Sequence, residues 1–115
     1  MNLTQIAFVI FALVAAGGVT MALMIAAKKP IPSFMPPGHG LAGLVALAVL
    51  LAANLTGPDT TERAWWAFGV FAAGFSGGAL LFRVIFKNKP PLLMVAGHGS
   101  IGAIGLYLLY GVAFG

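Results

Sequence analysis

The sequence predicts an all-α membrane protein in which four transmembrane helices form two tandem helical hairpins. Three observations predict this fold class. Hydrophobic residues make up 61% of the 115 residues and charged residues only 7%, whereas a soluble domain carries about 25% charged residues. Four apolar runs each approach the roughly 20 residues that cross a bilayer. The second half of the chain also repeats the pattern of the first. We therefore expect a single transmembrane domain over residues 1–115, surrounded by the lipid bilayer.

The four apolar runs define the expected helices. They span about residues 6–27, 38–55, 64–86 and 92–114. None of the runs alternates with a period of two residues, which argues against the strands of a membrane barrel. Before the third run, Thr60 or Thr61 is placed to cap the helix, and Glu62 lies near its positive end. The short turns between the runs leave no room for a soluble domain.

The distribution of charge between the turns predicts the orientation. The first and third turns hold four lysines, Lys28, Lys29, Lys87 and Lys89. The second turn holds Asp59, Glu62 and Arg63. By the positive-inside rule, the lysine-bearing turns lie in the cytoplasm, so both termini lie outside. We expect a bacterial inner membrane protein. Because the net charge of +4 is confined to the turns, it does not predict a nucleic-acid partner.

An internal repeat relates the two halves of the chain, over about residues 5–55 and 64–114. The informative matches pair Gly17-Gly18 with Gly77-Gly78, Lys29-Pro30 with Lys89-Pro90, and Gly38-His39-Gly40 with Gly97-His98-Gly99. Each repeat contains two helices, so both repeats enter the membrane in the same direction and are related by an axis along the membrane normal. The repeat therefore predicts that its two histidines lie at the same depth and face each other across that axis, near the cytoplasmic side.

The only two histidines of the chain, His39 and His98, lie in a Met-x-x-Gly-His-Gly motif that occurs twice. Gly43 and Gly102 follow them by four residues, so each lies on the same helix face as its histidine. We predict a binding site formed by these four residues. Its other predicted members are the double glycines of the first and third helices and one arginine, namely Gly17, Gly18, Gly77, Gly78 and Arg83.

Two opposed imidazoles are suited to bind a haem iron through its two axial positions. The neighbouring glycines leave space for a flat macrocycle, and Arg83 can neutralise its propionates. This arrangement resembles that of membrane b-type cytochromes in general. The resemblance implies haem b and electron transfer, either within a larger complex containing other membrane subunits or to quinone. Another tetrapyrrole, with magnesium in place of iron, stays open because an imidazole can ligate either metal.

Two other functions fit parts of the sequence. A purely structural or accessory subunit of a membrane complex needs no cofactor, and glycine-rich faces are an ordinary means of packing membrane helices. A small proton or cation transporter would use the imidazoles, whose charge changes near neutral pH. However, the expected helices hold no Asp or Glu to complete a proton relay. We do not expect a stand-alone enzyme, because the sequence lacks a nucleophile triad, a phosphate loop and paired carboxylates.

Overall fold

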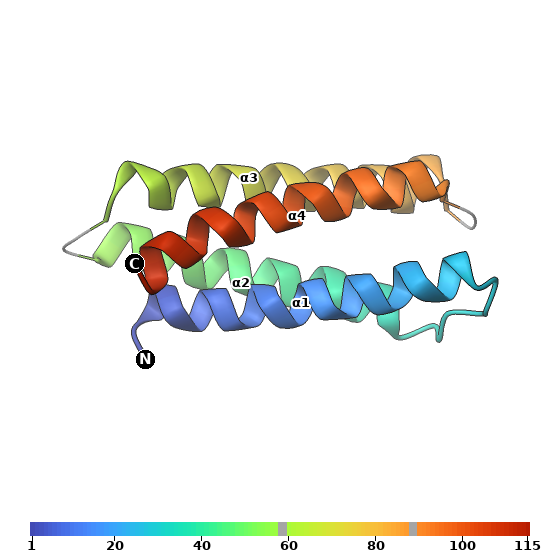
Figure 1. Cartoon of the computed structure of the whole chain (residues 1–115), viewed down its shortest axis with the longest axis horizontal. Coiled ribbons are helices and arrows are strands. Elements are labelled where there is room, and N and C mark those ends of the chain that lie inside the picture. The colour runs from blue at the N-terminus through green and yellow to red at the C-terminus, as the bar shows by residue number, and fades with distance from the viewer. Residues whose placement is uncertain (58–59, 88–89) are drawn as a thin grey trace.

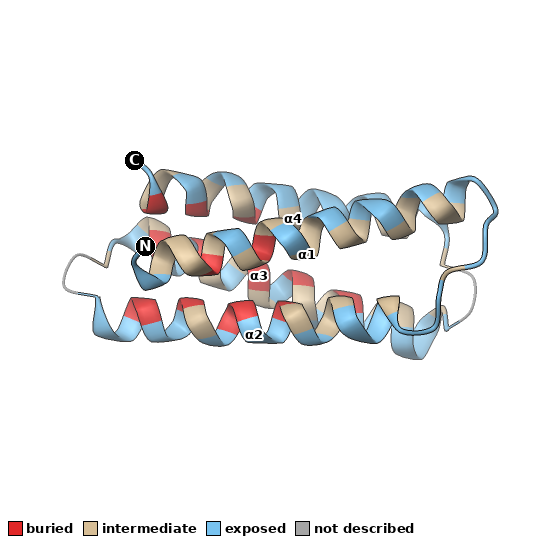
Figure 2. Cartoon of the chain, turned by 90° about the horizontal axis from the view of Figure 1, so that it is seen from below, coloured by how far each residue is buried: buried red, intermediate tan, exposed pale blue. Residues whose placement is uncertain are grey.

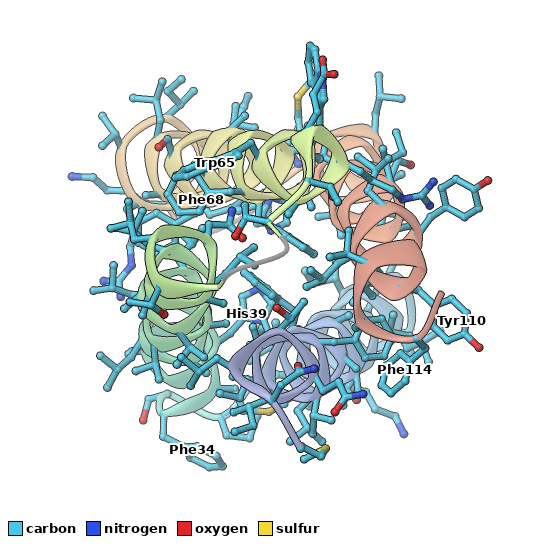
Figure 3. The ribbon with its side chains drawn as sticks, turned by 90° about the vertical axis from the view of Figure 1, so that its left-hand side faces the viewer. Phe34, His39, Trp65, Phe68, Tyr110 and Phe114 are labelled. Carbon is cyan, nitrogen blue, oxygen red and sulfur yellow. The ribbon has the colours of Figure 1, made fainter. Side chains whose placement is uncertain are left out.

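The computed structural model describes residues 1–57, 60–87 and 90–115, which form a bundle of four long helices (Figure 1). In chain order these are α1 (Leu3–Ala26), α2 (Met35–Thr56), α3 (Glu62–Leu80) and α4 (Leu92–Ala113), with a π-helical segment, η1 (Leu81–Ile85), continuing α3. Each of the four spans is long and apolar enough to cross a membrane. Helix α1 packs against α2 and α4, and α3 packs against the same two helices. Viewed along the bundle, α2 and α4 therefore lie on one diagonal and α1 and α3 on the other (Figure 3).

The bundle is 46 Å long and about half as wide, with extents of 22 and 20 Å across. Both termini and the α2–α3 turn lie at one end, which we call the termini end (Figure 1). The α1–α2 and α3–α4 turns lie at the other end, which we call the histidine end because His39 and His98 are close to it. The length exceeds the roughly 30 Å of a bilayer's hydrocarbon core.

Helix α1 has well-defined caps. At its start, Asn2 and Gln5 form a capping box in which each side chain accepts a hydrogen bond from the other residue's backbone N–H. At its end, Lys28 adopts a left-handed conformation with φ of 56°. The Lys28 N–H donates to Ile25 and the Lys29 N–H donates to Met24, which is the Schellman pattern that satisfies the last helical carbonyls.

Helices α2 and α3 each begin slightly earlier than the apolar pattern predicts. Helix α2 begins at Met35 instead of Gly38 because Pro36 and Pro37 occupy its first turn, where a missing N–H costs nothing. Helix α3 begins at Glu62, and Thr61 is its N-cap, with a side-chain oxygen that accepts from the Ala64 N–H.

The end of the third span departs from the predicted helix. The sequence predicts a regular helix to about residue 86, but the last turn before Phe86 is π-helical. There the Phe86 N–H donates to the Leu81 carbonyl at 2.7 Å, five residues back. The wider turn changes the direction of the side chains that follow Leu80, including Phe82 and Arg83.

The buried core lies toward the termini end (Figure 2). Its largest fully buried side chains are Leu50 of α2 and Leu109 of α4. Across the other diagonal, the rings of Phe11 and Phe71 stack with centroids 3.6 Å apart and an interplanar angle of 5°. The outer faces of the helices carry many exposed large apolar side chains, as expected of helices that face lipid.

Candidate functional site

The structure brings the two histidines together inside the bundle. His39 lies in the second turn of α2, and His98 lies at the same end of α4 on the opposite side of the bundle. Their ring centroids are 6.1 Å apart, and the ring planes are inclined by 68°. Figure 3 shows the His39 side chain pointing into the interior, whereas Phe34 lies outside. The pair therefore joins two helices that are distant in sequence and are not direct neighbours in the bundle.

The imidazole of His39 occupies the space that two glycines of α1 leave beside it. A Cβ atom at Gly18 would lie 3.0 Å from Cε1 of His39, and a Cβ atom at Gly17 would lie 3.9 Å from Nδ1. The Nδ1 atom is buried and makes no hydrogen bond of good geometry among the described residues. The backbone of Val14 on α1 is nevertheless within hydrogen-bonding reach of the imidazole, in keeping with the rule that buried polar atoms nearly always have a partner.

His98 packs against a glycine of α3, as His39 packs against the glycines of α1. A Cβ atom at Gly78 would lie 2.5 Å from Cε1 of His98, which is closer than real Cβ atoms approach. The opposite flank of the imidazole meets Phe82 of η1, with ring centroids 5.3 Å apart and an edge-to-face angle of 84°. His98 is therefore held between a glycine, an aromatic edge and the second imidazole.

The other predicted site residues lie at different distances from the imidazoles. Gly77 and Gly102 face open space, because a Cβ atom at either would meet no atom within 4 Å. Gly43 is buried, and its nearest side chains are Phe75 and Val14 instead of a histidine. Arg83 is exposed on η1, one residue beyond the phenylalanine that contacts His98.

A groove of about 380 Å³ opens beside His98 between α3 and α4. Gly74 and Gly77 line it from α3, and Gly97 lines it from α4. Leu81, the first residue of the π-helical segment, also lines the groove. Neither the groove nor Phe82 is predicted by the sequence, because no residue pattern in this chain signals where an α-helix widens into a π-helix.

The chemistry of the site is that of a paired imidazole donor set. Across residues 1–57, 60–87 and 90–115, no group of three or more His, Cys, Asp or Glu side chains is arranged to hold a metal ion. A structural zinc ion requires four protein ligands, and a catalytic one requires three. Two imidazoles are therefore too few for a bare ion, but they suffice for a metal that arrives with ligands of its own.

Comparison of the chain with models of known protein families, with curated proteins and with solved structures finds no match. The class of protein is therefore described from its fold and its candidate site alone. The chain is a four-helix protein with helices apolar enough to cross a membrane, and its two histidines meet between diagonal helices.

Proposed function

We propose that this chain is a small integral membrane subunit that binds a b-type haem between His39 and His98. The observation that carries the proposal is the facing pair of imidazoles, with ring centroids 6.1 Å apart. Two metal–nitrogen bonds of about 2 Å each take up roughly 4 Å of this span. The remaining roughly 2 Å is shared by the distances from the two ligating atoms to their ring centres. The spacing therefore suits one metal ion between both rings.

The donor set fits a tetrapyrrole. The macrocycle supplies four nitrogen ligands in one plane and leaves two axial positions, which histidine commonly fills. This chain offers two imidazoles, and among the described residues no third His, Cys, Asp or Glu side chain joins them. A magnesium tetrapyrrole satisfies the same coordination and is the alternative cofactor.

The surroundings of the pair also suit a flat, mostly apolar ring. Gly77 and Gly102 place no side chain in the space beside them, whereas the space beside Gly17 and Gly18 is taken by the His39 imidazole itself. The acidic groups of a haem would lie toward the histidine end, where Arg83 and the lysine-bearing turns supply positive charge. These residues would hold the ring and balance its charge, and the apolar interior would exclude water from it.

Haem iron supplies reversible one-electron chemistry. The described residues outside the helices form only short turns, so the chain offers little surface to a soluble donor. We therefore propose that it exchanges electrons within the membrane, with other subunits of a respiratory or photosynthetic complex or with a quinone. In this proposal the two helical hairpins are duplicated units in a bacterial inner membrane, and the basic turns lie on the cytoplasmic side.

A structural role is the second candidate, and one observation favours it. Both imidazoles already fill the space beside glycines, since a Cβ atom at Gly18 or Gly78 would lie within 3.0 Å of a histidine. Small residues that allow close packing are typical of membrane helix interfaces. On this alternative, His39 and His98 join the helices without any cofactor, and the chain acts as an accessory subunit.

The proposal is tested by the visible absorption spectrum of the detergent-purified protein, recorded oxidised and then reduced with dithionite. We expect sharp reduced bands that disappear in both His39→Ala and His98→Ala, because each variant would remove one of the two residues proposed to hold the haem. Ser100→Ala, an exposed change two residues after His98, is the matched control and should keep the bands. A folded wild-type protein without absorption above the aromatic region would refute the proposal and leave the structural role.

A further inference from the structure

The supports of the two imidazoles are equivalent in the two halves of the chain. Each imidazole lies against a glycine of the preceding helix, and the backbone one turn earlier on that helix is within hydrogen-bonding reach of the ring. For His39 these residues are Gly18 and Val14, and for His98 they are Gly78 and Gly74. The two sets correspond to each other in the repeat predicted from the sequence. Bringing the two histidines together therefore needs only what both halves contain.

One neighbour of the pair breaks this equivalence. Phe82 follows Gly78 by four residues, about one helical turn, so it also lies near His98. Its ring meets the His98 imidazole with centroids 5.3 Å apart and an interplanar angle of 84°. The corresponding residue of the first half is Ala22, whose methyl group offers no such surface. Among the described residues, the one aromatic ring paired with His39 is that of His98, so His39 lacks this restraint.

An imidazole needs its surroundings to fix the plane of its ring. Rotation about the bond between Cβ and the ring is broad for histidine, so the rotamer alone does not set the plane. A main-chain group within reach restrains this rotation for both histidines alike. For His98, turning the ring would also disturb the edge-to-face contact with Phe82, which is a favoured geometry of two rings. Phe82 therefore distinguishes how firmly the two ring planes, inclined by 68°, are held.

The π-helical segment carries this ring. Phe82 is the second residue of η1. Residues 21–25 of α1, which correspond to η1 in the predicted repeat, are regular α-helix. π-Helical turns occur frequently at functional sites. Both differences between the halves, the aromatic ring and the wider turn, thus fall where the second half touches its histidine.

We infer that Phe82 is a positioning residue of the histidine pair, which holds the plane of the His98 imidazole while His39 is the ring that turns more freely. A phenyl ring ligates no metal, so Phe82 acts through His98. The inference rests on the proposed function for its consequence, because the inclination of two axial imidazole planes tunes the iron that they share. The restraint on His98 itself exists with or without haem and can be measured in either case.

The experiment is a nuclear magnetic resonance measurement of the mobility of the two imidazoles in the purified, dithionite-reduced protein. His39 and His98 are the only histidines, so ¹³C at the histidine Cε1 position gives two signals, which His39→Ala and His98→Ala assign. An imidazole can turn about its long axis whether or not a metal is bound, so the Cε1–H order parameter reports this rotation in both cases. We expect a higher order parameter for His98 than for His39. Phe82→Leu should abolish that difference by lowering the value for His98 alone.

Val84→Ala is the matched control, because Val84 lies in the same π-helical segment but is 61% exposed. It should leave both order parameters unchanged. Phe82→Tyr keeps the ring and should keep the difference, and Phe82→Met repeats the test if Phe82→Leu fails to fold. Equal order parameters for His39 and His98 in the wild-type protein would overturn the inference. So would an unchanged value for His98 in a folded variant without the ring.

Electron paramagnetic resonance of the oxidised protein tests the consequence for the metal. An imidazole donates π-electron density perpendicular to its plane, so steeply inclined planes raise two iron orbitals nearly alike and increase the largest g value of low-spin iron. Because 68° is already a steep inclination, a freed His98 ring should lower the average angle and shift this g value downward in Phe82→Leu. Val84→Ala should leave the signal unchanged. An unchanged signal in a haem-bearing Phe82→Leu protein would overturn the inference.

The absorption spectrum of each sample separates this inference from the proposed function. Haem bands together with equal mobility of the two imidazoles would overturn the role of Phe82 and leave the haem site standing. A loss of order at His98 in a Phe82→Leu protein, when the wild type carries no haem, would support the role of Phe82 and refute the proposed function.

Discussion

The two ends of the bundle are built from the same four helices but pack by different means. At the termini end, large side chains fill the interior, with Leu50 and Leu109 fully buried and Phe11 stacked on Phe71. At the histidine end, glycines and the imidazole pair lie between the helices instead. The difference indicates that one end of the bundle supplies stability and the other supplies the site.

The side-chain hydrogen bonds also differ between the two ends of the bundle. Near the termini end, the Arg63 side chain donates to the carbonyls of Leu108 and Tyr107. The Gln5 side chain donates to Ala113, which ties α1 to α4. Such interhelical bonds are worth about 0.6–2 kcal/mol each in membrane proteins. At the histidine end, the side-chain hydrogen bonds of Thr20 and Ser100 stay within their own helices, to the carbonyls of Ala16 and Ala96.

The largest effect should come from the core of the termini end. Leu50→Ala removes a fully buried side chain, and we expect it to lower the free energy of unfolding by about 2–5 kcal/mol. Leu44→Ala on the same helix removes a half-exposed leucine and should cost far less. Unfolding in mixed micelles of dodecyl maltoside and sodium dodecyl sulfate measures both. Equal losses for the two variants would mean that Leu50 does not belong to a stabilising core.

The next effect concerns the stacked phenylalanines. A Cβ atom at Gly105 would lie 2.6 to 2.9 Å from three ring atoms of Phe71. Phe71 cannot move away, because its other face stacks on Phe11. We expect Gly105→Ala to destabilise the bundle by about 1–3 kcal/mol. Gly102→Ala on the same helix meets nothing within 4 Å and should be neutral or slightly stabilising. A stable Gly105→Ala protein would show that this end is looser than its stacking indicates.

A smaller loss should follow removal of the arginine that ties α3 to α4. Arg63→Met keeps much of the side-chain volume but deletes both hydrogen bonds and the cation–π contact with Tyr107, whose ring centre lies 5.1 Å from the guanidinium carbon. We expect a loss of about 1–2 kcal/mol in the same micelle assay. Arg83→Met at the histidine end should change stability by less than about 0.5 kcal/mol, because Arg83 is exposed.

The sequence predicts some of these features because they follow from spacing. Four apolar runs predict four helices over nearly the same residues as in the structure. The spacing of the Gly-His-Gly motifs in the two halves predicts that His39 lies opposite His98, as it does. In each case the prediction needs only the helical period and the length of a membrane span, which are properties of the local sequence.

Other features depend on tertiary contacts and leave no such signal. The π-helical turn at Leu81, the groove behind it and the approach of Phe82 to His98 all depend on how α3 ends against α4. Arg63 is equally ambiguous in sequence, since a basic residue at a helix start predicts an exposed charge. Only the packed bundle shows that its guanidinium reaches two carbonyls of α4.

The smallest change in stability is expected at Gly78. This position also gives the sharpest test of the difference between the termini end and the histidine end. A Cβ atom there would lie 2.5 Å from Cε1 of His98, so Gly78→Ala must displace the imidazole. Unlike Phe71, this imidazole has open space beside it at Gly77 and Gly97. Replacing glycine by alanine also favours a helix by up to about 1 kcal/mol, which offsets part of the clash. We therefore expect the free energy of unfolding to change by less than about 1 kcal/mol.

The consequence for the site should be much larger than the consequence for stability. On the proposed function, moving one imidazole changes the 6.1 Å spacing that a single metal between both histidines would require. If the proposed haem is bound, we expect Gly78→Ala to lose most of the reduced haem absorption, whereas Gly69→Ala, on the same helix and meeting no atom within 4 Å, keeps it. If Gly78→Ala instead destabilises the bundle as strongly as Gly105→Ala, His98 is a packing residue. The histidine end would then be a second core, and the structural role would replace haem binding.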